Sequence, residues 1–321
     1  MSDRIETRAT RLLGIRYPIV QGGLARVAKA ELCAAVSEAG GLGQIATAGL
    51  ADAEALRAEI HRCRSLTDRP FGVNFPLGRM DITAMLEVAL EEKVAVIALT
   101  AGNPAPWIKR IAGAAKILVL IAGPELAKKA EAAGADMVAT VGFEGGGHIG
   151  RTDETTMVMV PRVVRAVAIP VLASGGIASG AGLLAALALG AEGVEMGTRF
   201  VATVEAHAHA NYKQALVAAD PAGTMIIKRS LGMPGRVLGG SYAQHVAARE
   251  LAGVGADEIV PLIAGTVNAA ATDEGRLEDG FVWAGQGVGL IDEILPAGEV
   301  VRRMAAEAAE GMLRLRAAFA E

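Results

Sequence analysis

The chain has 321 residues and a formal net charge of −4, and 52% of the residues are apolar while only 3% are aromatic. This charge, without a basic block, lacks the electrostatic pattern of a nucleic-acid binder, so we expect no nucleic-acid partner. The charged start of the chain and the lack of a long uninterrupted apolar stretch predict a cytoplasmic protein with no membrane partner.

Strand and helix patterns alternate in the first part of the chain, which is typical of parallel βαβ units. Strands are predicted at residues 17–20, 42–46, 71–74, 94–99 and 116–121, and helices at about 28–39, 51–64 and 124–133.

Three further strands follow, at residues 136–140, 170–174 and 192–196, with helices between them at about 157–167 and 179–189. The total of eight strands predicts an α/β fold, a (β/α)8 TIM barrel that closes near residue 200.

The last three strands all run into glycine. The segments are Glu144-Gly-Gly-Gly147-His148, then Ser174-Gly175-Gly176, then Gly197-Thr198. Glycine lets a backbone approach a ligand closely, and the ends of strands seven and eight are the usual phosphate site of such barrels. The pattern therefore predicts a phosphorylated cofactor at this end of the barrel.

Residues 204–321 are predicted to form a mainly helical lid or substrate region added to a barrel domain at residues 1–203. Helices are predicted at about 209–219 and 242–251, a strand at 224–228, and a C-terminal helix at 297–319 that packs back on the barrel. Helices at the open end of a barrel can close over a substrate. The apolar stripe of the last helix makes a homodimer possible.

His148 is the candidate catalytic residue. Its imidazole can exchange a proton near neutral pH, and it lies on a predicted flexible glycine loop at the carboxyl end of a strand. The alternative is a structural histidine bonded within its loop. The other histidines are expected on helix surfaces or at a helix cap, Cys33 and Cys63 are expected to be ordinary packing residues, and no metal site is predicted.

An ordered set of motifs resembles the nitronate monooxygenase (2-nitropropane dioxygenase-like) family of FMN enzymes, which includes flavin-type enoyl-ACP reductase and NAD(P)H:quinone reductase branches. The resemblance spans nearly the whole chain. Its motifs are residues 18–23, 40–43, 70–74, 144–150, 174–177, 196–200 and 284–286.

The resemblance implies a TIM barrel that binds FMN without a covalent link, and it implies roles for particular residues. His148 would be the active-site histidine. Glu144 is open between a cofactor contact and a plain loop carboxylate. The residues expected to bind the ring are Gln21, Gly22, Gly23, Asn74 and Gln286, those expected to cradle the phosphate are Ser174, Gly175, Gly176, Gly197 and Thr198, and Gly147 is expected beside the cofactor.

The resemblance leaves two reactions open. In one, NAD(P)H reduces FMN, which then reduces an enoyl thioester or a quinone, with His148 assisting protonation; in the other, an alkyl nitronate is oxidised with O2 and His148 acts as a base. Residues 155–156, 160–163 and 208–213 look like those of the flavin-type enoyl-ACP reductases, and residues 144–148 and 232–238 resemble relatives that act on CoA thioesters, so we expect a reductase of a small-molecule substrate. Alternatives from other classes are a colourless barrel for a phosphorylated sugar and a flavin binder without turnover.

Overall fold

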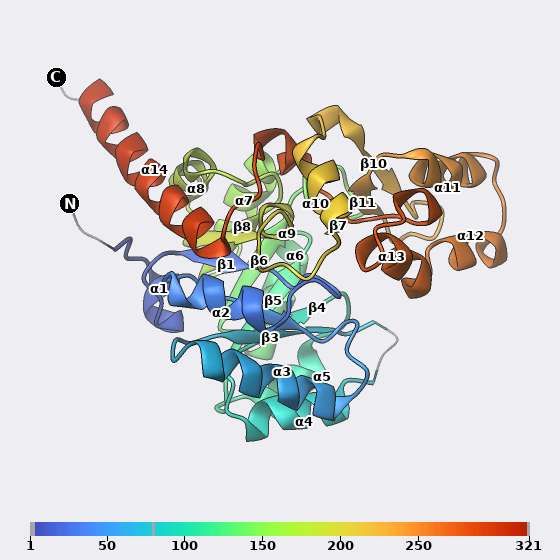
Figure 1. Cartoon of the computed structure of the whole chain (residues 1–321). Helices are drawn as coiled ribbons and strands as arrows, with labels where there is room; N and C mark the ends of the chain where they lie inside the picture. The colour runs from blue at the N-terminus through green and yellow to red at the C-terminus, as the bar shows by residue number, and fades with distance from the viewer. Residues whose placement is uncertain (1–3, 79–80, 320–321) are drawn as a thin grey trace.

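The computed structural model describes residues 4–78 and 81–319, so the first three residues of the charged N-terminal segment and the last two of the predicted lid region lie outside it. Eight parallel strands form a barrel with helices outside it, which confirms the predicted TIM barrel (Figure 1). The barrel strands are β1 (Ile19–Gln21), β2 (Gln44–Ala46), β3 (Gly72–Pro76), β4 (Val96–Thr100), β5 (Lys116–Ile121), β6 (Met137–Val141), β8 (Val171–Ser174) and β9 (Gly193–Met196).

The sheet order is β1-β9-β8-β6-β5-β4-β3-β2, and every neighbouring pair is parallel. An isolated parallel bridge between Val20 and Leu42 joins the two ends of the sheet. The side chain of Gln21 extends this seam, because its Oε1 accepts from the backbone N–H of Gln44 at 2.9 Å and its Nε2 donates to the carbonyl of Gln44 at 3.2 Å.

The strands form where the sequence is almost continuously apolar, as expected for strands buried on both faces. Small and branched side chains fill the barrel, among them Val20, Ala98, Leu118 and Leu172. This explains why so few aromatic residues are needed for the core.

Helices cover the outside of the barrel, and local sequence signals mark their ends. Asp52 and Ser179 accept hydrogen bonds from the first turns of α3 and α8, while Gly134 ends α6 in the left-handed conformation. The helices of this part are α1 (Arg8–Leu13), α2 (Ala30–Glu38), α3 (Ala53–Leu66), α4 (Thr83–Glu91), α5 (Ala105–Ile111), α6 (Pro124–Ala133), α7 (Thr156–Val164), α8 (Gly180–Ala188) and α9 (Thr198–Val201).

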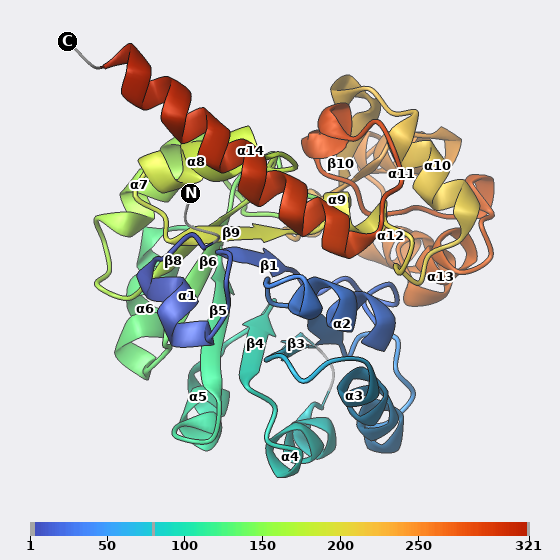
Figure 2. The same ribbon diagram turned by 60° about the vertical axis from the view of Figure 1, so that its left-hand side comes forward.

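The segment after α9 forms a separate cluster of helices with a small antiparallel sheet at one end of the barrel (Figure 1). The last helix leaves this cluster and packs along α8 and α2 (Figure 2). The elements are α10 (Ala210–Val217), η1 (Pro221–Gly223), β10 (Thr224–Ile227), β11 (Gly235–Leu238), α11 (Ser241–Leu251), α12 (Ala256–Leu262), α13 (Gly265–Thr272), η2 (Leu277–Asp279), η3 (Gln286–Leu290) and α14 (Ala297–Ala318).

The histidine loop differs from the flexible loop that was expected. Gly147 and His148 form a short strand, β7 (Gly147–His148), which pairs with Gly235 and Arg236 of β11. The sheet order β10-β11-β7 therefore ties His148 to the region after the barrel. Among the described residues, none of the helices combines the length and the apolar character needed to cross a membrane.

Candidate active site

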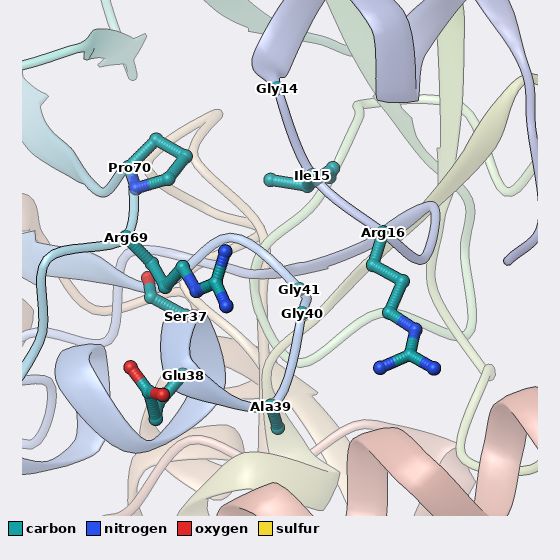
Figure 3. A pocket seen from close by; sticks show the side chains of 10 residues that line it. All are labelled: Gly14, Ile15, Arg16, Ser37, Glu38, Ala39, Gly40, Gly41, Arg69 and Pro70. Atoms are coloured by element: carbon teal, nitrogen blue, oxygen red, sulfur yellow. The ribbon is translucent and has the colours of Figure 1, made fainter. Parts of the chain in front are cut away.

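A small cavity of about 90 Å³ lies at the amino ends of the barrel strands (Figure 3). It is lined by residues just before β1, β2 and β3, including Arg16 and Arg69. The polar side chains near it are used for structure, since Ser37 accepts from the backbone of Gly43 and Glu38 accepts from Thr67. This end of a TIM barrel serves stability rather than catalysis.

The large cavity, of about 590 Å³, opens at the carboxyl ends of the strands. Its size lies within the ~300–1,000 Å³ of ordinary small-molecule sites. One side is formed by the barrel and the other by the region after α9, which contributes Tyr212, Lys228, Asn268 and Trp283. Ten of the predicted site residues line it: Gly22, Gly23, Asn74, Gly147, His148, Ser174, Gly175, Gly176, Gly197 and Thr198.

The floor of the cavity requires glycine at the end of β1. A Cβ on Gly22 would lie 2.3 Å from Oε1 of Glu195, and a Cβ on Gly23 would lie 2.1 Å from Cγ of Asn74. The side chain of Asn74 is buried, and its Nδ2 has no hydrogen-bond partner among the described residues. A buried donor of this kind is expected to meet an acceptor, here a ligand in the cavity.

Glu195 lies under the same floor. Its Oε2 accepts a hydrogen bond of 2.6 Å from the hydroxyl of Ser174, and the residue is almost completely buried. Burial raises the pKa of this carboxyl, while the hydrogen bond from Ser174 acts in the opposite direction. The site therefore contains a carboxyl group biased toward its neutral form.

The end of β8 turns sharply into the cavity. Gly175 and Gly176 have φ of 102° and 74°, a conformation that side chains rarely adopt. Consecutive residues in such turns present backbone N–H groups to anions. Next to them, the hydroxyl of Thr198 accepts from the backbone N–H of Gly285 at 2.9 Å, which joins the end of β9 to the segment before η3.

His148 stands opposite this floor, with Lys228 and Trp283 beside it. Its Nε2 lies 2.5 Å from Nζ of Lys228, and its ring centroid lies 5.1 Å from that of Trp283. The ring is exposed to the open cavity, yet the surrounding protein desolvates it. This desolvation, with the charge of Lys228 as a second cause, lowers the pKa of His148 to about 4.

Three predicted cofactor residues do not line the cavity. Gln21 closes the barrel seam described above, and Gln286 donates its backbone N–H to the carbonyl of Glu144 at 2.9 Å. The carboxylate of Glu144 accepts from both the backbone N–H and the hydroxyl of Thr156, at 2.8 and 3.0 Å. In this geometry these residues hold the walls of the cavity in place.

Glu195 and Lys228 were missed from the sequence. Glu195 is the penultimate residue of a predicted strand. A carboxylate among the apolar residues of a barrel strand was the signal that could have marked Glu195 as a site residue. Lys228 was taken as the end of a predicted strand, and its approach to His148 depends on the pairing of β7 with β11. His209 was expected to cap or pack a helix, and it caps α10 by accepting from the backbone of Asn211.

The sequence of this chain is similar to those of several known proteins. A family model described as nitronate monooxygenase matches residues 6–85 and 77–307. A nitronate monooxygenase of Pseudomonas aeruginosa is 35% identical over 354 residues, covering 96% of this chain and 99% of that protein. The (3aS,4S,5R,7aS)-5-hydroxy-7a-methyl-1-oxo-octahydro-1H-indene-4-carboxyl-CoA dehydrogenase of Rhodococcus jostii is 38% identical over 235 residues, covering 73% of this chain and 66% of that protein.

Two solved structures are similar over almost the entire chain. FabK from Thermotoga maritima is 41% identical with a TM-score of 0.92, covering 98% of this chain and 100% of that one. Nitroalkane oxidase from Streptomyces ansochromogenes is 32% identical with a TM-score of 0.81, covering 95% of this chain and 99% of that one.

Proposed function

Because this chain belongs to the nitronate monooxygenase family, we propose that it is an FMN-dependent oxidoreductase that uses NAD(P)H to reduce an electron-poor acceptor. The acceptor classes are an enoyl thioester and a quinone. The observation that carries this choice is the size of the cavity together with the apolar side chains that line it in addition to the glycine-rich strand ends.

The residues at the strand ends fit FMN. The turn at Gly175 and Gly176 suits the phosphate, with Ser174, Gly197 and Thr198 beside it. The backbone of Gly22 and Gly23 lines the cavity without side chains, where a flat ring could lie, and the unpartnered Nδ2 of Asn74 is a donor for a ring acceptor. Thus the buried polar groups and the crowded glycines agree with the cofactor that the family resemblance implies.

The chemistry that bound FMN supplies is hydride exchange between NAD(P)H and the acceptor. The protein's own task is to orient the acceptor, exclude water and manage a proton. His148 can do the last of these, since a neutral imidazole can both give and take a proton as its two ring nitrogens exchange roles. We propose that the region 204–321, which forms the far wall of the cavity, acts as the lid.

The apolar side chains that line the cavity favour a thioester over a small nitronate. Leu120, Ile121, Leu126 and Ile149 line the cavity on the side of β5 and β6, with Pro76 from β3 nearby. An acyl chain would bury against these side chains, at a gain of about 25 cal/mol per Å² of apolar surface. The CoA thioester in the name of the Rhodococcus relative supports the same substrate class.

Nitronate oxidation is the second candidate. It is favoured by the full-length similarity to the Pseudomonas nitronate monooxygenase and by the low pKa of His148, which leaves the imidazole ready to act as a base. A small anionic substrate would also be attracted to Lys228 beside His148.

Substrate turnover separates the two candidates. The purified protein would be assayed for NADH and NADPH oxidation with trans-2-octenoyl-CoA and with a benzoquinone, and for O2 uptake with propionate-3-nitronate. We expect nicotinamide oxidation that depends on one of the first two acceptors and yields the saturated thioester or the quinol. O2 uptake with the nitronate as the only productive reaction would contradict the proposal.

A further inference from the structure

Lys228 adopts a backbone conformation that is unusual for a lysine. Its φ is +69°, in the left-handed region that favours glycine. One carboxylate fixes this turn, since Glu250 of α11 accepts from the backbone N–H of Lys228 at 2.7 Å and from the N–H and hydroxyl of Ser230 at 2.9 and 2.6 Å. Strained residues held by several contacts concentrate at functional sites, so the position of this side chain needs an explanation.

The side chain of Lys228 points into the large cavity rather than into solvent. The residue is 5% exposed and lines the cavity, with Nζ 2.5 Å from Nε2 of His148. The ammonium also lies 5.2 Å from the centre of the Trp283 ring. Lysine is rarely buried this far without a carboxylate partner, and here the partner is an imidazole.

The surroundings of Lys228 and His148 favour a protonated lysine beside a neutral imidazole. Burial lowers the pKa of Lys228 to about 8, with Glu250 acting in the opposite direction. The neighbouring Arg229 turns away to pair with Asp153 at 2.9 Å. With the pKa of His148 lowered to about 4, the imidazole is mainly neutral at pH 7, whereas the Lys228 side chain is mainly protonated.

We propose that Lys228 supplies the proton that His148 delivers to the substrate, through the contact between Nζ and Nε2. This inference rests on the proposed function, in which the acceptor takes a hydride and then a proton. Lys228 thus acts through His148, and its strained backbone conformation serves to bring an ammonium group to the imidazole.

The step balances without a further reagent. After hydride transfer the acceptor carries a negative charge, and it takes the proton from Nδ1 of His148 while the electron pair of that N–H bond stays on the ring. Nε2 takes a proton from the ammonium of Lys228, whose electron pair stays on the amine. The products are a neutral amine, the other neutral imidazole tautomer and the protonated acceptor, and water in the open cavity reprotonates the amine.

The first test is the titration of the His148 ring, which does not depend on turnover. It is followed by NMR on the purified protein, with the His148 signals assigned by their loss in His148→Gln. Lys228→Met removes the charge and leaves an unbranched side chain that is one atom shorter, so the pKa of His148 should rise. Lys93→Met is the control, because Lys93 is also left-handed, with φ of +49°, but exposed and outside the cavity. An unchanged His148 pKa in Lys228→Met would overturn the inference.

The second test is the pH dependence of acceptor reduction. The pair holds one transferable proton between its two apparent pKa values, so wild-type activity should fall as the pH rises through about 8. In Lys228→Met this fall should move below about pH 6.5, the unperturbed histidine value, with at least tenfold lower activity at pH 7.

Lys228→Arg separates proton supply from a structural role. Arginine keeps the positive charge but does not release its proton in proteins. Activity at pH 7 should therefore stay at least tenfold down, whereas recovery to the wild-type rate would overturn the inference. If no acceptor were reduced by any variant, the proposed function itself would have failed, while the NMR titration would still decide whether Lys228 controls the proton on His148.

Discussion

In the proposed mechanism His148 acts at neutral pH with a neutral imidazole, whose pKa is lowered, in contact with a second titratable group, Lys228. Both conditions arise from the place of the residue rather than from its type. Its short strand is paired to β11 on one edge, and Trp283 packs beside the ring. The other histidines have ordinary surroundings, such as His61, which lies exposed 3.1 Å from Glu92.

Replacing His148 by alanine should separate cofactor binding from turnover. His148→Ala should retain the visible flavin absorption, because the predicted phosphate and ring contacts lie on other strands, but lose about 10²–10⁴-fold in kcat, the usual worth of a positioned proton-transfer group. His61→Ala is the matched control and should keep the wild-type rate. Retained turnover in His148→Ala would remove this residue from the mechanism.

Glycine at position 23 is required by the carboxamide of Asn74. In Gly23→Ala the new methyl group would overlap that side chain, with three of its atoms at 2.1–2.6 Å, and would displace it from the cavity floor. We expect loss of bound FMN in the purified protein and a destabilisation of about 1–3 kcal/mol. Gly223→Ala is the control, since an added Cβ there meets nothing within 4 Å. Equal flavin content in the two variants would refute this account of the floor.

The buried carboxyl of Glu195 should make stability depend on pH. Burial raises the pKa of Glu195 in the folded protein. Glu195 therefore stabilises the folded state most at pH values below its pKa in the unfolded chain, and this stabilisation is lost as the pH rises through its pKa in the folded protein. Glutamine cannot ionise, so the advantage of wild type over Glu195→Gln in Tm should shrink between pH 4 and pH 8. Parallel Tm curves for the two proteins would show that Glu195 does not titrate in this range.

At the level of residues, the sequence was informative where the signal is local. The places of the glycines at strand ends and of a histidine after a strand could be predicted because each follows from the position of a strand, whereas Asn74 was expected from the family resemblance. Lys228 could not, because its contact with His148 spans 80 residues along the chain and depends on a sheet that joins two regions. Glu144 was left open because its contact with Thr156, 12 residues further on, depends on where α7 begins.

Among the elements, the loop between β6 and α7 is the one on which the site depends most. Glu144 ties this loop to the first turn of α7 through Thr156, and Gln286 holds the same loop from the other side. The loop carries His148 a few residues later. Its shape is therefore fixed by the start of α7, by the backbone of Gln286 and by the pairing of β7 with β11.

Glu144→Gln should act mainly on this element. Losing the charged acceptor at the start of α7 should cost about 1 kcal/mol in the free energy of unfolding, measured by urea denaturation, as for other helix caps. Because the side chain does not line the cavity, bound FMN should be retained. Glu125→Gln, in the exposed first turn of α6, is the control and should cost less. Loss of FMN with unchanged stability would instead assign Glu144 to the cofactor.

The barrel strands and most helices were predictable because their patterns are long or bounded by glycine and proline. All eight predicted strands are confirmed within two or three residues at their ends. The strands β7 and β11 were not predicted, since residues 147–148 and 235–238 are short segments that contain glycine and pair with residues distant in the sequence or with a neighbouring strand.

For the whole molecule, the carboxyl ends of eight strands and the wall formed after α9 enclose one large cavity, as a barrel with an added region should. The α14 helix runs from this wall back over α8 and α2 (Figure 2). The region after α9 therefore contacts the barrel both around the cavity and along α14. The division at residues 203 and 204, like a homodimer, stays a prediction. Membership of the family confirms the resemblance that the motifs indicated. The substrate could not be predicted from the sequence, because it depends on cavity walls that are formed by distant segments of the chain.

The central claim is that reducing equivalents enter from a nicotinamide. The most direct measurement is the anaerobic loss of the visible flavin absorption when the purified protein is mixed separately with NADH, NADPH and propionate-3-nitronate. We predict rapid bleaching by NADH or NADPH, followed by recovery of the colour when an enoyl thioester or a quinone is added. Bleaching by the nitronate alone would contradict the account and identify the protein as a nitronate-oxidising enzyme.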